Sequence, residues 1–230
     1  MRITHLGHAA VLVETGGYSL LIDPGNIDPA WHELTGLNAV LLTHLHPDHL
    51  DPEHLPALLA ANPGAQIVGE PSIVEAAAGT ATGGGATVPE LPGAVASAPG
   101  ETTALGEVQV TAVGGRHAVV HPDLPQIGNV GFVISAPGEP TLFHPGDSYA
   151  ATPDGVDVLA VPLWGPWAKV GETVDFVRAV DPSHAFAIHD GHLADRGRAL
   201  VIGRIGAMAS VAVHDLNGQG PVSFPLERQA

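Results

Sequence analysis

Cysteine is absent from this 230-residue chain, and lysine is nearly so, with Lys169 as its single occurrence. Without thiols the protein has neither disulfides nor cysteine-based catalysis. Lys and Arg together number 8 against 24 Asp and Glu, which gives a formal net charge of −16. So few cations cannot form the basic surface that binds long nucleic acids or anionic membranes. We therefore expect neither a nucleic acid nor a membrane as a partner.

Long apolar runs are missing as well. No run approaches the roughly 18 residues of a membrane-spanning helix, and the amino-terminal residues enter strand-like sequence without the apolar core of a secretory signal. Both features predict a cytoplasmic protein. Aromatic residues are only 4% of the chain whereas hydrophobic residues reach 45%, so aliphatic side chains must fill the core. A chain of this length buries enough surface to fold as one domain, residues 1–230.

Short β-type runs alternate with helical segments along the chain. Strands are expected at residues 3–6, 10–14, 18–23, 39–42, 66–68, 108–113, 130–134, 141–143, 156–161, 185–188 and 211–213. Helices are expected after Asp51-Pro52 and at residues 72–78, 172–180 and 194–208, with Asp51 and Ser72 as N-caps. Residues 80–99, rich in Gly, Ala and Pro, are expected to form a surface excursion with weak strands. This order predicts an α/β sandwich with helices outside two sheets.

Histidine is unusually frequent, with 14 in the chain, and imidazole is the commonest metal-binding side chain. The densest cluster, His44-Leu45-His46-Pro47-Asp48-His49, follows the apolar strand at residues 39–42. In an extended segment, His44 and His46 point to the same side and can bind one ion. Asp48 and His49 follow as the chain turns and can face a second ion. Imidazole and carboxylate together suit Zn²⁺, with Mn²⁺ or Fe²⁺ also possible.

More ligands must come from distant parts of the chain, because two protein ligands do not complete a metal site. His117, Asp147 and His189 each follow an expected strand. In open α/β proteins, ligand sites gather at the carboxyl ends of strands. His117 therefore fits the first ion and His189 the second, while the two oxygens of Asp147 can bridge both ions.

These residues, in this order, resemble the metallo-β-lactamase superfamily. The match consists of Thr43-His44-x-His46-x-Asp48-His49 followed by His117, Asp147 and His189. The opening Thr4-His5-Leu6-Gly7-His8-Ala9-Ala10, with Leu20-Leu21-Ile22-Asp23-Pro24, looks like a narrower branch of small metal-dependent hydrolases similar to the L-ascorbate-6-phosphate lactonase. The chain departs from that branch after the last ligand, where Asp190-Gly191-His192 replaces a Gly-Thr type of turn and places two further polar groups near the metals.

The resemblance implies a four-layer αβ/βα sandwich with two divalent metal ions. By analogy, His44, His46 and His117 hold one ion, Asp48, His49 and His189 hold the other, and Asp147 bridges them. The implied activity is hydrolysis of a small ester, lactone or phosphodiester by a metal-bound hydroxide. Asp48 is also the candidate catalytic residue, because a carboxylate beside the second ion can orient or deprotonate the attacking water.

Residues beyond the ligand set are weaker candidates for contact with a small-molecule substrate, and each has a plain structural role as its alternative. The candidates are His8, Arg116, His121, Trp164, Trp167 and Lys169. His144, three residues before Asp147, is expected to support the ligands from outside.

Two other functions fit the same residues. Imidazole and carboxylate ligands also suit iron, so a mononuclear iron dioxygenase is one alternative. Diiron oxygen-handling relatives replace the second motif histidine with Glu, whereas this chain has His46. A non-catalytic metal-binding protein is the other alternative, although every expected ligand is present.

Overall fold

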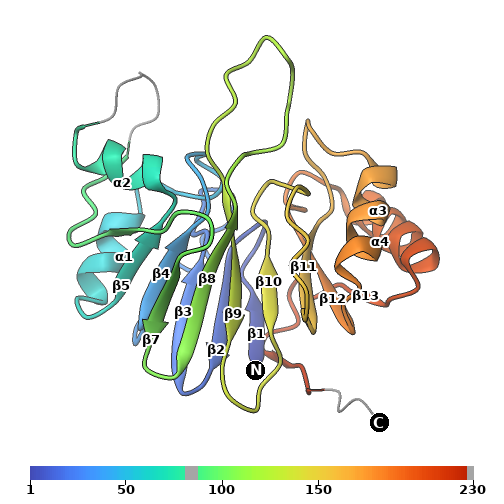
Figure 1. Cartoon of the computed structure of the whole chain (residues 1–230), viewed down its shortest axis with the longest axis horizontal. Coiled ribbons are helices and arrows are strands. Elements are labelled where there is room, and N and C mark those ends of the chain that lie inside the picture. The colour runs from blue at the N-terminus through green and yellow to red at the C-terminus, as the bar shows by residue number, and fades with distance from the viewer. Residues whose placement is uncertain (81–87, 227–230) are drawn as a thin grey trace.

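The computed structural model of the chain describes residues 1–80 and 88–226. Two seven-stranded sheets lie face to face (Figure 1). The first sheet contains, in spatial order, β14 (Val222–Ser223), β1 (Arg2–His5), β2 (Val11–Thr15), β3 (Tyr18–Ile22), β4 (Ala39–Leu42), β5 (Gln66–Gly69) and β6 (Val95–Ala96). The second contains β13 (Val213–His214), β12 (His184–Ile188), β11 (Val158–Pro162), β10 (Leu142–His144), β9 (Val130–Ser135), β8 (Val108–Gly114) and β7 (Thr102–Leu105).

Helices cover the outer face of each sheet, which gives four layers. In Figure 1, α1 (Leu55–Ala61) and α2 (Pro71–Ala77) lie on one side, and α3 (Val170–Val180) and α4 (Asp195–Ala209) on the other. One apolar cluster, which includes Phe132 and Phe186, fills the space between the sheets. Two more clusters pack the helices against their own sheets. The expected four-layer αβ/βα sandwich is therefore confirmed.

The strands that precede the candidate ligands all run in one direction within their sheets. β1 and β3 each pair antiparallel with β2, and β3 pairs parallel with β4. In the second sheet, β8 and β10 each pair antiparallel with β9, while β10, β11 and β12 are parallel. The carboxyl ends of β4 and β10 meet across the sandwich, where His49 Nε2 lies 3.2 Å from Asp147 Oδ1. This edge therefore collects loops from both sheets.

The helix starts differ from the expected N-caps. Glu70 rather than Ser72 caps α2, because the Glu70 carboxylate accepts a hydrogen bond from the Ser72 backbone N–H at 2.8 Å. Asp51 caps a turn that precedes α1, where its Oδ1 accepts the backbone N–H of Glu53 at 2.8 Å, and the helix begins only at Leu55. In both places a carboxylate satisfies the free N–H groups at the start of the turn.

The sequence does not predict the edge strands β7 and β14. Only the last residue of β7, Leu105, is buried, and β14 has only two residues, so neither carries a strong apolar pattern. Part of the expected excursion at residues 80–99 forms β6, whereas residues 81–87 lie outside the described residues. None of the helices in the described ranges is long and apolar enough to cross a membrane.

Candidate metal centre

The first pair of candidate ligands is held by a hydrogen-bond chain that starts at Asp23. The Thr43 hydroxyl donates to Asp23 Oδ2 at 2.7 Å, so its oxygen accepts from Nδ1 of His44 at 3.0 Å. The proton on Nδ1 leaves a lone pair on His44 Nε2, which lies 3.0 Å from Nδ1 of His46. Burial lowers the pKa of His44 well below its usual value, so this imidazole is neutral. Both nitrogens are thus available to one cation.

His49 lies between two carboxylates. Its Nδ1 donates to Asp23 Oδ2 at 2.7 Å, and its Nε2 lies 3.2 Å from Asp147 Oδ1. Burial lowers the pKa of His49, but the charges of Asp147 and Asp23 raise it well above its usual value. The Nε2 lone pair of the neutral ring would face a carboxylate oxygen, which is repulsive unless a proton or a metal ion lies between them.

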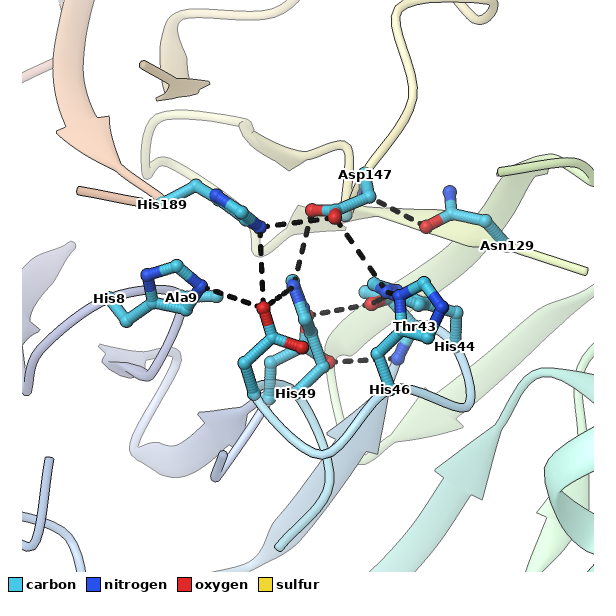
Figure 2. A network of polar contacts seen from close by, with 12 residues as sticks. His8, Ala9, Thr43, His44, His46, His49, Asn129, Asp147 and His189 are labelled. Atoms are coloured by element: carbon cyan, nitrogen blue, oxygen red, sulfur yellow. Dashed lines mark hydrogen bonds and ion pairs between the residues drawn. The ribbon is translucent and has the colours of Figure 1, made fainter. Parts of the chain in front are cut away.

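Asp147 is the centre of the cluster. Its Oδ2 lies 3.0 Å from His189 Nε2, 3.3 Å from His117 Nε2 and 3.8 Å from His44 Nε2. Figure 2 shows this carboxylate between His189 on one side and His44 and His46 on the other. Burial raises the pKa of Asp147, but His49 and His189 lower it well below its usual value, so it stays charged. The two carboxylate oxygens of Asp147 therefore lie close to candidate ligands of both proposed ions.

Asp48 lies on the solvent side of the cluster, and its side chain keeps 23% of its exposure. Its Oδ2 is 3.1 Å from His8 Nε2, 3.7 Å from His189 Nε2 and 4.0 Å from His49 Nε2. Burial raises the pKa of Asp48, but the hydrogen bond from His8 and the charge of His49 lower it below its usual value. A charged, partly exposed carboxylate is thus available beside the second group of imidazoles.

His8 orients Asp48, and its tautomer argues against a ligand role. Its Nδ1 accepts the Gly191 backbone N–H at 3.1 Å, so the ring proton lies on Nε2, which donates to Asp48 at 3.1 Å. Burial lowers the pKa of His8 to about 4 despite the hydrogen bond to Asp48, so the ring is neutral. His8 therefore holds Asp48 in place and ties it to the loop after His189.

The ligand atoms form two groups, within each of which they all lie within 4.8 Å of one another. One group is His44, His46, His117 and Asp147, and the other is His8, Asp48, His49 and His189. Within the described ranges, five buried atoms at this centre have no hydrogen-bond partner: the Nε2 atoms of His49, His117 and His189, Nδ1 of His189, and Oδ1 of Asp147. Buried polar atoms without partners are rare. Three imidazole nitrogens and a carboxylate oxygen that converge in this way fit divalent metal ions.

The sequence did not indicate the role of Asp23, which appeared only within the family resemblance. Its carboxylate accepts hydrogen bonds from the backbone N–H and hydroxyl of Thr43 and from the His49 ring. One carboxylate therefore orients both the start and the end of the motif at residues 43–49. Asp23 has a φ of 47°, and His8 and His189 have φ values of 53° and 54°. Left-handed backbone at non-glycine residues is strained and concentrates at functional sites. An aspartate directly after an apolar strand was the available signal.

Asn129 and Gly146 build the turn that presents Asp147. Asn129 accepts the Asp147 backbone N–H at 2.9 Å and donates to the Pro145 carbonyl at 3.0 Å. Gly146 has a φ of 61°, and a Cβ there would lie 2.4 Å from Asn129 Oδ1, so no larger residue fits. His144 donates to the Ala9 carbonyl at 3.2 Å and accepts from the Gly146 N–H at 3.3 Å, in line with its expected supporting role. A lone Asn in a loop gives no sequence signal.

The two expected cleft tryptophans have different environments. A cleft of about 360 Å³ opens over the ligands and is lined by His46, Asp48, His117, Val120, Asp147, Trp164, Pro166, Trp167, His189 and His192. Trp167 is buried and donates its Nε1 proton to Asp147 Oδ2 at 3.1 Å. Trp164 is exposed and lies against the ring of His192. Trp167 thus supports a candidate ligand, and Trp164 forms the mouth.

The other substrate candidates lie around this cleft rather than in it. His121 lines a separate cavity of about 220 Å³ next to His46 and His117. Arg116 and Lys169 line a third cavity of about 520 Å³, where Arg116 donates to Gln126 and Lys169 pairs with Glu172.

Asp190 was expected near the metals, but its carboxylate turns away from them. Asp190 Oδ1 lies 3.6 Å from His5 Nε2, and Oδ2 lies 3.5 Å from Arg198 Nη1. These partners compensate its burial, which raises the pKa of the carboxyl. Asp190 therefore connects β1 to α4. Of the two polar residues expected near the metals, Asp190 and His192, only His192 lines the cleft.

Comparisons with known proteins identify the family of this chain. The sequence profile of the Beta-lactamase superfamily domain matches residues 2–189. Protein Rv0786c of Mycobacterium tuberculosis is 38% identical over 97% of this chain and 100% of that protein. A UPF0173 metal-dependent hydrolase of Carboxydothermus hydrogenoformans is 30% identical over 87% of this chain and 93% of that protein. Igni18, a metallo hydrolase of Ignicoccus hospitalis, shares the fold with a TM-score of 0.68 at 16% identity, over 97% of this chain and 98% of that one. The chain belongs to the beta-lactamase superfamily, as its motif predicted.

Proposed function

We propose that this protein is a hydrolase that holds two divalent metal ions, with Zn²⁺ the best match, and cleaves a small ester, lactone or phosphodiester. The observation that carries the proposal is the convergence of lone-pair nitrogens and carboxylate oxygens around Asp147, with buried atoms that have no partner in the described part of the chain. Relatives named as metal-dependent hydrolases support the reaction class.

The seven residues suggested by the sequence are the proposed ligands. His44, His46 and His117 serve one ion, Asp48, His49 and His189 serve the other, and Asp147 serves both. When bound, such ions supply a water of lowered pKa and polarise the scissile group.

The chain's own contribution to the reaction centres on Asp48. This carboxylate borders the cleft, stays charged, and is oriented by the proton that His8 donates to it. It can accept a proton from an attacking water, or hold that water by a hydrogen bond while the scissile bond breaks. Trp167 fixes the Asp147 carboxylate by its Nε1 proton, and together with Trp164 it keeps bulk water from one side of the cleft.

The first experiment measures metal content and turnover together. Purified protein is stripped with a chelator, reloaded with Zn²⁺, Mn²⁺ or Fe²⁺, and assayed with a carboxylic ester, a lactone, a phosphodiester and a β-lactam. We expect two ions per chain and hydrolysis that returns with the metal. Oxygen consumption by a protein with one iron and no hydrolysis would instead identify the dioxygenase, and bound metal with neither activity would identify a metal-binding protein.

A matched pair of histidine variants separates the ligand set from other histidines. His54 forms, with His32 and Asp51, a separate group that could hold a metal ion, and its Nδ1 pairs with Asp51 Oδ2 at 2.7 Å. His46→Ala should lower metal content and abolish hydrolysis, whereas His54→Ala should leave both unchanged. Equal losses in the two variants would contradict the assignment of the centre.

The proposal also covers partners and location. The partner is a small molecule, since a net charge of −16 opposes nucleic acid and anionic membranes. A cytoplasmic location is proposed with it, and cell fractionation followed by immunodetection tests this.

A further inference from the structure

Two cavities open side by side at the candidate ligands, and Val120 lines both. The cleft of about 360 Å³ contains the candidate ligands and Trp164. The cavity of about 220 Å³ shares His46 and His117 with that cleft. Its remaining wall consists of residues 118–121 and 124–127, among them Val119, Val120 and Leu124. This wall belongs to the loop between β8 and β9, which projects beyond the strand ends in Figure 1. A group attached to a substrate at the metals has this cavity directly beside it.

The walls of both cavities are apolar apart from the candidate ligands and a few other polar side chains. Among the described residues that line them, Asp48 and Asp147 are the only carboxylates, and neither Lys nor Arg is present. Four large apolar side chains are exposed around the opening, with Val119 and Leu124 at 56%, Trp164 at 39% and Val120 at 38%. A cluster of exposed apolar side chains beside a pocket marks a surface that binds apolar groups.

The cations of this region face a different cavity and have partners of their own. Arg116 and Lys169 line the cavity of about 520 Å³, which shares His117, Ala118, Val119 and Gln126 with the smaller apolar cavity. Arg116 donates to Gln126 at 3.1 Å, and Lys169 donates to Glu172 at 2.6 Å. A phosphate or carboxylate at the remote end of a substrate would therefore meet no Lys or Arg in the cleft of about 360 Å³ or in the cavity of about 220 Å³.

We propose that the substrate carries an uncharged alkyl or aryl group next to its scissile bond, and that this group occupies the cavity formed by the loop residues Val119, Val120 and Leu124. The inference rests on the proposed hydrolase function and narrows its substrate class to a neutral, lipophilic ester or lactone. An anionic group in that cavity would lose part of its hydration without gaining a Lys or Arg partner. The same reasoning disfavours a phosphorylated sugar lactone as the substrate.

Three p-nitrophenyl esters test the proposal on zinc-loaded protein. p-Nitrophenyl hexanoate and mono-p-nitrophenyl adipate have acyl chains of equal carbon number, but the second ends in a carboxylate, and p-nitrophenyl acetate lacks the chain. Because each buried methylene is worth about fourfold in binding, we expect kcat/KM for the hexanoate to exceed the other two by at least tenfold. Equal kcat/KM values for the three esters, with hydrolysis intact, would overturn the substrate class and leave the hydrolase function standing.

Lysine variants at the cavity wall sharpen the test. Val120→Lys and Leu124→Lys should each reduce the preference for the hexanoate over the adipate by at least tenfold, since the new ammonium group meets the terminal carboxylate. Val95→Lys is the control, because Val95 is similarly exposed, at 42%, but lies on β6. An unchanged preference in both cavity variants would place the acyl chain elsewhere.

A binding measurement keeps the proposal testable if none of these esters is cleaved. Hexanohydroxamic acid and adipic monohydroxamic acid both carry a metal-binding head group, and calorimetry on zinc-loaded protein gives their dissociation constants. We expect the hexanoyl compound to bind at least tenfold more tightly. Equal or reversed affinities would overturn the apolar cavity, whereas tight hexanoyl binding without any hydrolysis would contradict only the proposed reaction. A chain that retains no metal would overturn both.

Discussion

Two carboxylates join the two sheets at opposite ends of the sandwich, and they differ in how their oxygens are satisfied. Glu139, in the hairpin between β9 and β10, accepts from the Thr15 hydroxyl at 2.6 Å and from the Gly16 N–H at 2.9 Å. Its Oε2 also lies 2.9 Å from the amino group of Met1. Asp147, which follows β10 at the other end, is buried, and its Oδ1 has no hydrogen-bond partner in the described ranges.

The difference separates a structural carboxylate from a functional one. Both carboxylate oxygens of Glu139 accept protons from donors of the chain itself, so this carboxylate joins the two sheets without any bound cation. Asp147 accepts one proton from the chain's uncharged donors, from Trp167 Nε1 to Oδ2, and otherwise faces imidazole nitrogens such as those of His117 and His189. A buried carboxylate in that setting is costly unless a cation is bound. Incomplete satisfaction, rather than burial or charge alone, marks the site.

The largest expected effect on metal content and turnover comes from removing the Asp147 carboxylate. Asp147→Ala takes away the oxygens that face ligands of both ions, so metal content should fall at both sites and turnover should become undetectable. Glu139→Ala is the matched control and should keep both metal content and kcat. Elemental analysis and a turnover assay on one working substrate check both variants. Two ions retained in Asp147→Ala would refute the bridging assignment.

The next effect separates ligation from proton transfer at Asp48. Asp48→Asn keeps the shape and one oxygen but removes the negative charge that the His8 proton and the His49 ring stabilise. We expect the ion at His44, His46 and His117 to remain while kcat falls about 10²–10⁴-fold, the usual scale for losing acid–base assistance. A variant that turns over at the wild-type rate would leave Asp48 with ligation only.

A smaller effect is expected from the carboxylate behind the ligands. Asp23→Asn replaces an acceptor of the His49 Nδ1 proton with an amide, so the His49 ring loses its fixed tautomer. Changes in such supporting groups weaken metal affinity by about 10–100-fold. Competition with a fluorescent zinc chelator measures this shift. Thr43→Val tests the other hydrogen-bonded path from Asp23, which runs through the Thr43 hydroxyl to His44. Unchanged affinity in both variants would show that backbone contacts alone orient the motif.

The sequence predicted the fold and suggested the ligand set, because buried strands and the histidine motif at residues 44–49 leave local patterns; the ligand set stays a prediction. Apolar runs of strand length indicated the buried strands, and closely spaced histidines after one of them indicated metal. The supporting residues leave no such pattern. Asn129 contacts Asp147 across 18 positions of sequence, and His8 reaches Asp48 across 40. Their roles follow from the way two sheets close over one another, which no local window of sequence contains. The extent of the domain, residues 1–230, stays a prediction.

The smallest effect is a pH-dependent loss of stability when the Glu139 carboxylate is replaced. Burial raises the pKa of Glu139, but its bonds from the Met1 amino group, Thr15 and Gly16 lower it to about 2. A folded-state pKa below the unfolded value of 4.5 stabilises the fold above pH 4.5, and that stability is lost as pH falls toward 2. Because solvent screens this partly exposed group, we expect about 1 kcal/mol, so Glu139→Gln should lower the Tm by about 2–4 °C at pH 7.

The Tm difference between Glu139→Gln and the parent chain should shrink toward pH 2, since Glu139 is then protonated in the unfolded state and increasingly protonated in the folded state. Glu14→Gln is the matched control, because among the described residues Glu14 forms an ion pair only with the exposed Arg2 on the same sheet, a kind of pair that contributes little. Calorimetric scans of metal-free protein between pH 7 and pH 2.5 keep the metal ligands out of the comparison. A constant Tm difference across that range would mean that the side chain joins the sheets by packing, and that its charge contributes nothing.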